Sequence, residues 1–157
     1  MIAMTHLRKS QKTAEKCGAD LVIIETMSDT LEAKAAVLAV KENTSLPIFC
    51  TMTFDESYKT LTGGDVKVMS AIMEGLGVDC VGINCGLGPA QIGEMMTDLA
   101  EISSIPIMHS QTQVCRKSKT AKQFTMYYRN NLQTNVNIWQ SLVRLFSAVV
   151  AVQHLTI

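Results

Sequence analysis

Hydrophobic and polar positions follow two alternating patterns along the first two thirds of the chain. Short runs of apolar and β-branched residues are each followed by a segment whose apolar residues recur every three or four positions. The first pattern is typical of strands covered on both faces, and the second is typical of helices with one buried side. Their repetition at intervals of about 30 residues predicts βα units around a parallel sheet.

Four such strands are predicted, at 20–25, 47–53, 79–85 and 105–108. Helices are expected to begin at three N-terminal signals: Asp29, which with Glu32 resembles a capping box, Asp65 after a Gly-Gly turn, and Pro89. The expected inward stripes are Leu31, Ala35 and Leu38; Val66, Met69, Ile72 or Met73, and Leu76; and Ile92, Met95, Met96, Leu99 and Ile102. A (β/α)8 barrel and a doubly wound sheet both fit this period, and four units are half the strands of a barrel.

The pattern stops after His109. Residues 109–157 show no clear period, and only 138–152 is apolar enough to be buried. All 14 Asp and Glu residues lie between Glu15 and Glu101, so residues 1–108 carry a net charge of −6 and residues 109–157 carry +6. A basic tail can indicate a nucleic-acid partner. These basic residues form no helical stripe or motif, so we expect an irregular tail and no nucleic acid.

Cysteine usage and hydropathy bear on the compartment. The five cysteines are odd in number and lack disulfide-scaffold or CxxC spacing, which favours reduced thiols. No apolar run reaches the roughly 18 residues of a membrane-spanning helix, and the first residues lack the apolar core of a signal peptide. We therefore expect a soluble, cytoplasmic protein without membrane contact.

Candidate functional residues are those that end the predicted strands, because ligands bind at the carboxyl ends of parallel strands. The residues there are Glu25, Thr53, Phe54, Asp55, Asn84, Cys85 and His109. A carboxylate ending an apolar strand needs a cation or a ligand, and a salt bridge at the rim is the simpler account of Glu25. Cys85, before a Gly-rich loop, is either an accessible thiol or a small buried residue. Cys50, Cys80 and all three histidines are expected to be structural.

Four segments taken together resemble the homocysteine S-methyltransferase family, and within it the homocysteine-binding barrels of cobalamin-dependent methionine synthases. The segments are GADLVIIETMSDTLEAKAA (18–36), PIFCTMTFD (47–55), TGGD (62–65) and GINCGLGP (82–89). They extend over about 90 residues in the family's order. The resemblance implies that residues 1–108 are a partial homocysteine-binding (β/α)8 barrel containing about strands four to seven.

The same resemblance implies a set of site residues. Glu25 matches the glutamate that contacts the homocysteine amino group, and Asn84 is a weaker candidate for substrate binding. Cys85 matches one of three cysteine ligands of a catalytic zinc ion, whose coordination would deprotonate the substrate thiol. Methylcobalamin carried on a separate module is the methyl donor that the resemblance implies.

The chain departs from the family pattern in two respects. The first barrel strands are missing, and no GGCC motif, which supplies the other two zinc ligands, is present. A shift of the reading frame can account for the second. If the codons for 111–117 are read one base upstream, they can encode Pro-Asn-Ala-Gly-Leu-Pro-Lys. This sequence resembles the family's loop after the seventh barrel strand. Codons for 148–155 can encode Gly-Gly-Cys-Cys-Gly-Thr-Thr-Pro. The hypothesis is a one-base loss near Met108 and His109.

Two functional interpretations follow. In the first, the chain transfers a methyl group to homocysteine and forms methionine, with Glu25 and Cys85 in the site. In the second, it is a catalytically inactive barrel fragment that lacks two of three zinc ligands. A metabolite-binding α/β domain with a basic nucleic-acid tail is a third, less favoured interpretation. Zinc content and methyl transfer separate the first two.

Overall fold

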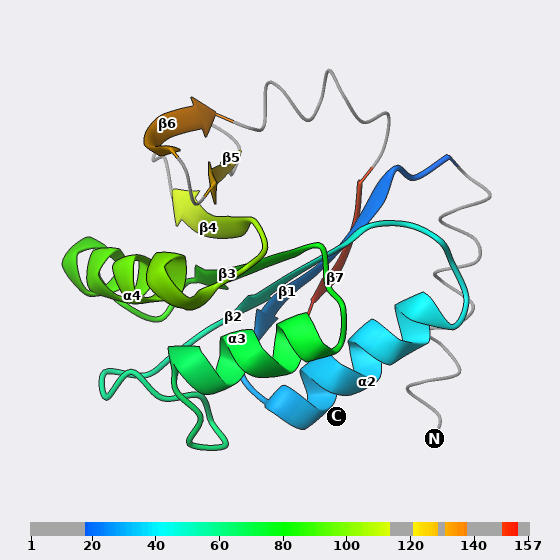
Figure 1. Cartoon of the computed structure of the whole chain (residues 1–157), viewed down its shortest axis with the longest axis horizontal. Coiled ribbons are helices and arrows are strands. Elements are labelled where there is room, and N and C mark those ends of the chain that lie inside the picture. The colour runs from blue at the N-terminus through cyan, green and yellow to red at the C-terminus, as the bar shows by residue number, and fades with distance from the viewer. Residues whose placement is uncertain (1–17, 114–120, 129–130, 138–148, 154–157) are drawn as a thin grey trace.

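A computed structural model describes residues 18–113, 121–128, 131–137 and 149–153, with side chains over 18–109 (Figure 1). The helices in these ranges are α2 (Thr30–Lys41), α3 (Val66–Gly75) and α4 (Pro89–Ile102). The strands are β1 (Leu21–Met27), β2 (Ile48–Met52), β3 (Cys80–Asn84), β4 (Ile107–Gln113), β5 (Ala121–Tyr128), β6 (Asn131–Asn137) and β7 (Val149–Gln153). Within the described ranges, no helix has both the length and the apolar character needed to cross a membrane.

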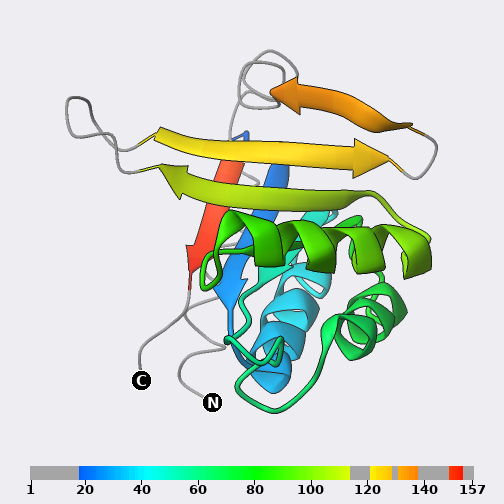
Figure 2. The ribbon, with the colours of Figure 1, turned by 90° about the vertical axis from the view of Figure 1, so that its left-hand side faces the viewer.

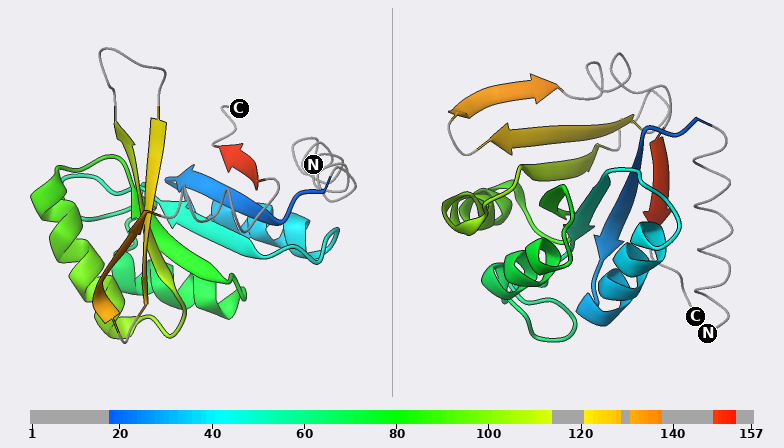
Figure 3. Two further views of the ribbon diagram at one scale, coloured as in Figure 1. Left: turned by 90° about the horizontal axis from the view of Figure 1, so that it is seen from above. Right: turned by 45° about the vertical axis from the view of Figure 1, so that its right-hand side comes forward.

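The strands form one sheet in the order β6-β5-β4-β3-β2-β1-β7 (Figure 2). β1 to β4 run parallel to one another and β7 is parallel to β1, whereas β5 pairs antiparallel with β4 and β6 pairs antiparallel with β5. Seen from above, β4 and β5 run at a steep angle to β1, as expected from the accumulated twist of a sheet (Figure 3). The parallel strands β1 to β4 confirm the α/β class and agree with a partial barrel.

The main core lies between the parallel strands and the three helices. Alternate strand residues such as Val22, Ile24 and Ile83 pack there against α2, α3 and α4. A smaller cluster occupies the opposite face of the strands, and its members are Leu21, Ile23, Phe49, Cys80 and Met108. β3 and β4 approach so closely at Gly82 that an added Cβ would overlap the carbonyl oxygen of Met108. A residue without a side chain is therefore needed in the middle of this buried strand.

The four predicted strands and the three helix starts are confirmed. Asp29 accepts hydrogen bonds from the backbone N–H groups of Leu31 (2.6 Å) and Glu32 (3.4 Å). Asp65 accepts one from the N–H of Val68 at 3.0 Å. These bonds satisfy donors that a helix leaves unpaired in its first turn. α4 begins at Pro89 as expected.

The buried stripes of the helices differ from the prediction in part. The expected stripe of α2 was wrong, because Leu31 is 71% exposed and the buried residues are Ala33, Ala36, Val37, Ala39 and Val40. The small alanine side chains let this helix lie close to the sheet, whereas a prediction from hydrophobicity alone selects the leucines as the buried residues. On α3, Met73 rather than Ile72 is buried with Val66 and Met69. On α4 the stripe is confirmed except at its end, where Ile102 is 39% exposed.

Residues 109–157 contain regular structure that the sequence pattern did not predict. β4 continues to Gln113, and β5, β6 and β7 all lie in this segment. The sequence of β5, AKQFTMYY, is rich in aromatic and β-branched residues, which favour strands without any clean alternation. The expectation of an irregular tail therefore does not describe these ranges.

Candidate functional site

The carboxyl ends of β1, β2 and β3 bring together the residues that the sequence singled out. Glu25 lies near the end of β1, Asn84 is the last residue of β3, and Cys85 follows it. Glu25 is 2% exposed and Asn84 is 1% exposed, whereas Cys85 is half-buried. A salt bridge of Glu25 at the rim of the sheet, the simpler account from the sequence, stays a prediction, and the carboxylate that it would involve is buried. A buried carboxylate, a buried amide and a partly accessible thiol thus share one end of the sheet.

A β-bulge in β1 determines how Glu25 is presented. Ile24 pairs with Cys50 and Met27 pairs with Met52, so Glu25 and Thr26 both lie opposite the single residue Thr51. Met27 packs with Ile24 in the core that faces the helices. In a regular strand, two residues three positions apart would point to opposite faces of the sheet, so the bulge is what places both side chains on the same face. Thr26 has a φ of +63°, which is rare for a β-branched residue. Bulges of this kind redirect side chains next to binding sites.

Hydrogen bonds from Asn84 connect the ends of β1 and β3. Its Nδ2 donates to Oγ1 of Thr26 and lies 3.6 Å from Sγ of Cys85. The backbone N–H of Thr26 donates to Oγ1 of Thr51 at 3.2 Å. Three neighbouring strands are therefore joined at their carboxyl ends by side chains, in addition to the backbone ladder.

The other polar atom of the Asn84 amide is not satisfied in this way. Its Oδ1 is buried and has no hydrogen-bond partner among the described residues. A buried acceptor without a partner costs about 1–3 kcal/mol, so such atoms are rare and need an explanation. With Nδ2 committed to Thr26 and Cys85, Oδ1 is an acceptor suited to an N–H or ammonium group of a ligand.

The thiol of Cys85 differs from the two other thiols that the structure describes. Cys50 and Cys80 are completely buried in β2 and β3, and burial raises the pKa of Cys50 to about 12 and that of Cys80 further. Both are structural, as predicted. Cys85 has a φ of +54° and precedes Gly86, whose φ is +80°. An added Cβ on Gly86 would lie 2.5 Å from the carbonyl oxygen of Phe54, so this turn packs directly on the end of β2.

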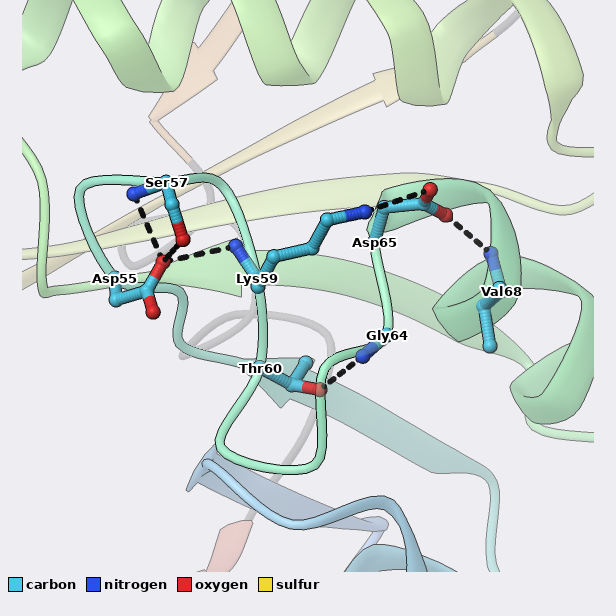
Figure 4. Close-up of polar contacts among 7 residues, drawn as sticks. All are labelled: Asp55, Ser57, Lys59, Thr60, Gly64, Asp65 and Val68. Carbon is cyan, nitrogen blue, oxygen red and sulfur yellow. Dashed lines mark hydrogen bonds and ion pairs between the residues drawn. The ribbon is translucent and has the colours of Figure 1, made fainter.

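Two other strand-end residues, Asp55 and His109, do not join this group. Asp55 turns into its own loop, where one carboxylate oxygen accepts hydrogen bonds from Ser57 Oγ (2.6 Å) and from the N–H groups of Ser57 (2.9 Å) and Lys59 (3.0 Å) (Figure 4). Lys59 in turn pairs with Asp65 at 3.2 Å. Nδ1 of His109 lies 3.0 Å from the carbonyl oxygen of Ile83, in keeping with a structural role. His6 and His154 lie outside the described residues.

The loop carboxylates predict a dependence of stability on pH. The Ser57 hydroxyl holds the pKa of Asp55 below its usual 3.8, and the Val68 N–H does the same for Asp65. Because both pKa values are lower in the folded state, the stabilisation is present at neutral pH and is lost as pH falls through the folded-state values. Asp55→Asn should lower the urea midpoint at pH 7 slightly and flatten its decline below pH 4. Glu56→Gln, on the same loop, is the control; an equal effect there would contradict the assignment.

Sequence reasoning found Glu25, Asn84 and Cys85 but missed Thr26 and Thr51. The available signal for Thr26 was the run ETM, in which a polar residue follows a buried glutamate near the end of the strand. This signal is weak because a β-bulge has no fixed sequence pattern. No group of three His, Cys, Asp or Glu side chains in the described ranges is arranged to hold a metal ion. Cys85 alone among these residues does not make the three-thiolate zinc site that the resemblance implied.

Comparison with known proteins gives a consistent result. The family model described as homocysteine S-methyltransferase matches residues 3–145. The methionine synthase of Mycobacterium leprae is 36% identical over 95 residues, and that of Mycobacterium tuberculosis is 34% identical over 95 residues. Each alignment covers 57% of this chain and 8% of the relative. The chain belongs to the homocysteine S-methyltransferase family.

Proposed function

We propose that residues 18–109 form the part of a methyltransferase site that receives homocysteine, and that the reaction served is methyl transfer to its sulfur. One observation carries the proposal: at the carboxyl ends of β1 and β3, Asn84 links Cys85 to Thr26, the residue after Glu25, and keeps one buried acceptor unpaired among the described residues. The family membership and the methionine synthase relatives support the choice of reaction.

In this proposal the substrate amine lies toward the bulge of β1. The carboxylate of Glu25 attracts the ammonium group, and burial strengthens that attraction because water does not screen it. Oδ1 of Asn84 accepts one of the ammonium hydrogens, which satisfies an otherwise costly buried atom. The sulfur of homocysteine then lies toward Cys85. In the transfer, the substrate sulfur loses its proton, forms a bond to the methyl carbon and gives methionine, while the bond between methyl and donor breaks.

Zinc and the methyl donor belong to the proposal as well. Zinc bound to three thiolates would hold the substrate sulfur deprotonated near neutral pH, since a free thiol has a pKa of about 8.5. Cys85 would be one of those three ligands, and the described residues do not supply the other two. Methylcobalamin on a separate module is the donor proposed here, because the four family-like segments resemble those of cobalamin-dependent methionine synthases.

A second candidate function follows from the incomplete ligand set. A chain with a single thiol at the site would bind zinc weakly and would not activate homocysteine. In that case the chain is an inactive fragment of the barrel. The absence of a GGCC motif from the 157 residues supports this alternative.

Zinc content and methyl transfer distinguish the two candidates. The purified chain is equilibrated with zinc, freed of excess metal and assayed for bound zinc and for methionine formation from homocysteine and methylcobalamin. Stoichiometric zinc that is lost in Cys85→Ala would establish a working site. Cys50→Ala is the matched control, because that thiol is buried away from the carboxyl ends. No zinc and no methionine in any form would leave the inactive fragment as the function of this chain.

A further inference from the structure

We infer that Thr26 is a positioning residue: its left-handed bulge, held by Thr51 and Asn84, fixes the end of β1 that carries Glu25 relative to the turn that carries Cys85. The inference rests on the proposed function, since it concerns how the two ends of one substrate would be held. It adds Thr26, which was not among the candidate residues at the ends of the predicted strands.

The first observation is the backbone conformation. Thr26, Tyr58 and Cys85 are the non-glycine residues with positive φ in the described ranges. A β-branched residue is strongly disfavoured there, because its branched Cβ crowds the backbone. Such conformations persist only where surrounding interactions impose them, and they gather at functional sites. Two of these three residues flank the ends of β1 and β3.

The second observation is that one amide contacts both of these residues. Asn84 Nδ2 donates to Thr26 Oγ1 and lies 3.6 Å from Cys85 Sγ, and Thr51 Oγ1 accepts the Thr26 N–H at 3.2 Å. Asn84 and Thr51 are buried, so water does not readily replace a lost bond. If Thr26 loses its hydroxyl, Asn84 loses one of its two acceptors, and the amide is freer to turn. We therefore expect a change at Thr26 to reach the Cys85 turn, two strands away.

The test compares Thr26→Val, which keeps the branched shape and removes the hydroxyl, with Thr26→Ser, which keeps the hydroxyl. Thr30→Val is the matched control, because Thr30 also bonds through its hydroxyl, to Thr62 at 3.2 Å, near the same end of the sheet but outside this network. Backbone amide resonances of Cys85 and Gly86 are followed by NMR in the 157-residue chain, and homocysteine affinity is measured by calorimetry.

Thr26→Val should shift the Cys85 and Gly86 resonances and weaken homocysteine binding about tenfold, the effect of one buried hydrogen bond. Thr26→Ser should restore both, and Thr30→Val should change neither. If Thr26→Val does not fold, Thr51→Val, which removes the acceptor of the Thr26 N–H, should give the same shifts. Unchanged Cys85 and Gly86 resonances in the folded variant would overturn the inference. If Thr26→Val shifts the Cys85 and Gly86 resonances but the unmodified chain does not bind homocysteine, the result would support the role of Thr26 in positioning the Cys85 turn. It would contradict homocysteine as the substrate.

Discussion

Cys85 is expected to react with iodoacetamide at pH 8 more than about a hundredfold faster than Cys50 or Cys80. The reactive species is the thiolate, and a pKa of about 12 leaves roughly one Cys50 thiol in ten thousand ionised at that pH. Burial raises the pKa of Cys80 as well, and neither of these sulfurs is accessible to reagent. Cys85 is half-buried at the carboxyl end of β3.

The measurement is the time course of alkylation at each cysteine, followed by peptide mass spectrometry. Cys17 and Cys115 lie outside the described side chains, so both are replaced by serine in the tested protein. In urea all three remaining thiols should react at similar rates, which shows that the fold causes the difference. Comparable rates for Cys80 and Cys85 in the folded protein would contradict the placement of the site thiol. The result also matters for function, because a thiol enclosed in the core would have to become exposed before it could bind a metal ion from solution.

The parallel part of the fold was predictable because its signals are local and repeated. The runs LVII and CVGI are continuous and apolar, and each helix start carries a capping residue or a proline. The α2 stripe was not predictable in the same way, because alanines pack closely without standing out in a hydrophobic pattern. The strands after His109 were missed because their pairing depends on strand propensity and neighbours rather than on period.

For the site, position at a strand end gave seven candidate residues, and the family resemblance singled out Glu25, Asn84 and Cys85 among them. Their burial and mutual contacts depend on which strands are neighbours and on the bulge in β1, and neither follows from one strand's sequence. Thr26 and Thr51 became relevant only when the register placed one opposite the other. Residues that hold a site in place are thus harder to predict than those that line it.

The largest expected effect concerns the residues after His109. We propose that 109–157 is the out-of-frame remainder of the barrel to which the partial barrel in 1–108 belongs. Two family-like motifs arise in the same shifted frame and in the family's order, and the shift also explains why every acidic residue precedes the tail. Re-encoding the chain one base upstream after His109 would place Gly-Gly-Cys-Cys at about positions 148–151 and supply two further thiols.

The re-encoded chain is expected to bind about one zinc ion per chain, because three thiolates with one open position are a typical catalytic zinc site. The chain as it stands should retain far less than one, since a single thiolate leaves most of the coordination shell to water. Methionine formation should appear only in the re-encoded chain and disappear with Cys85→Ala. Zinc binding that survives Cys85→Ala would contradict the ligand assignment.

Sequencing the locus tests the frame itself: an intact frame across Met108 and His109, with codons unrelated to the family motifs, would refute the hypothesis. The tail would then have to be explained as a sequence selected in its own right.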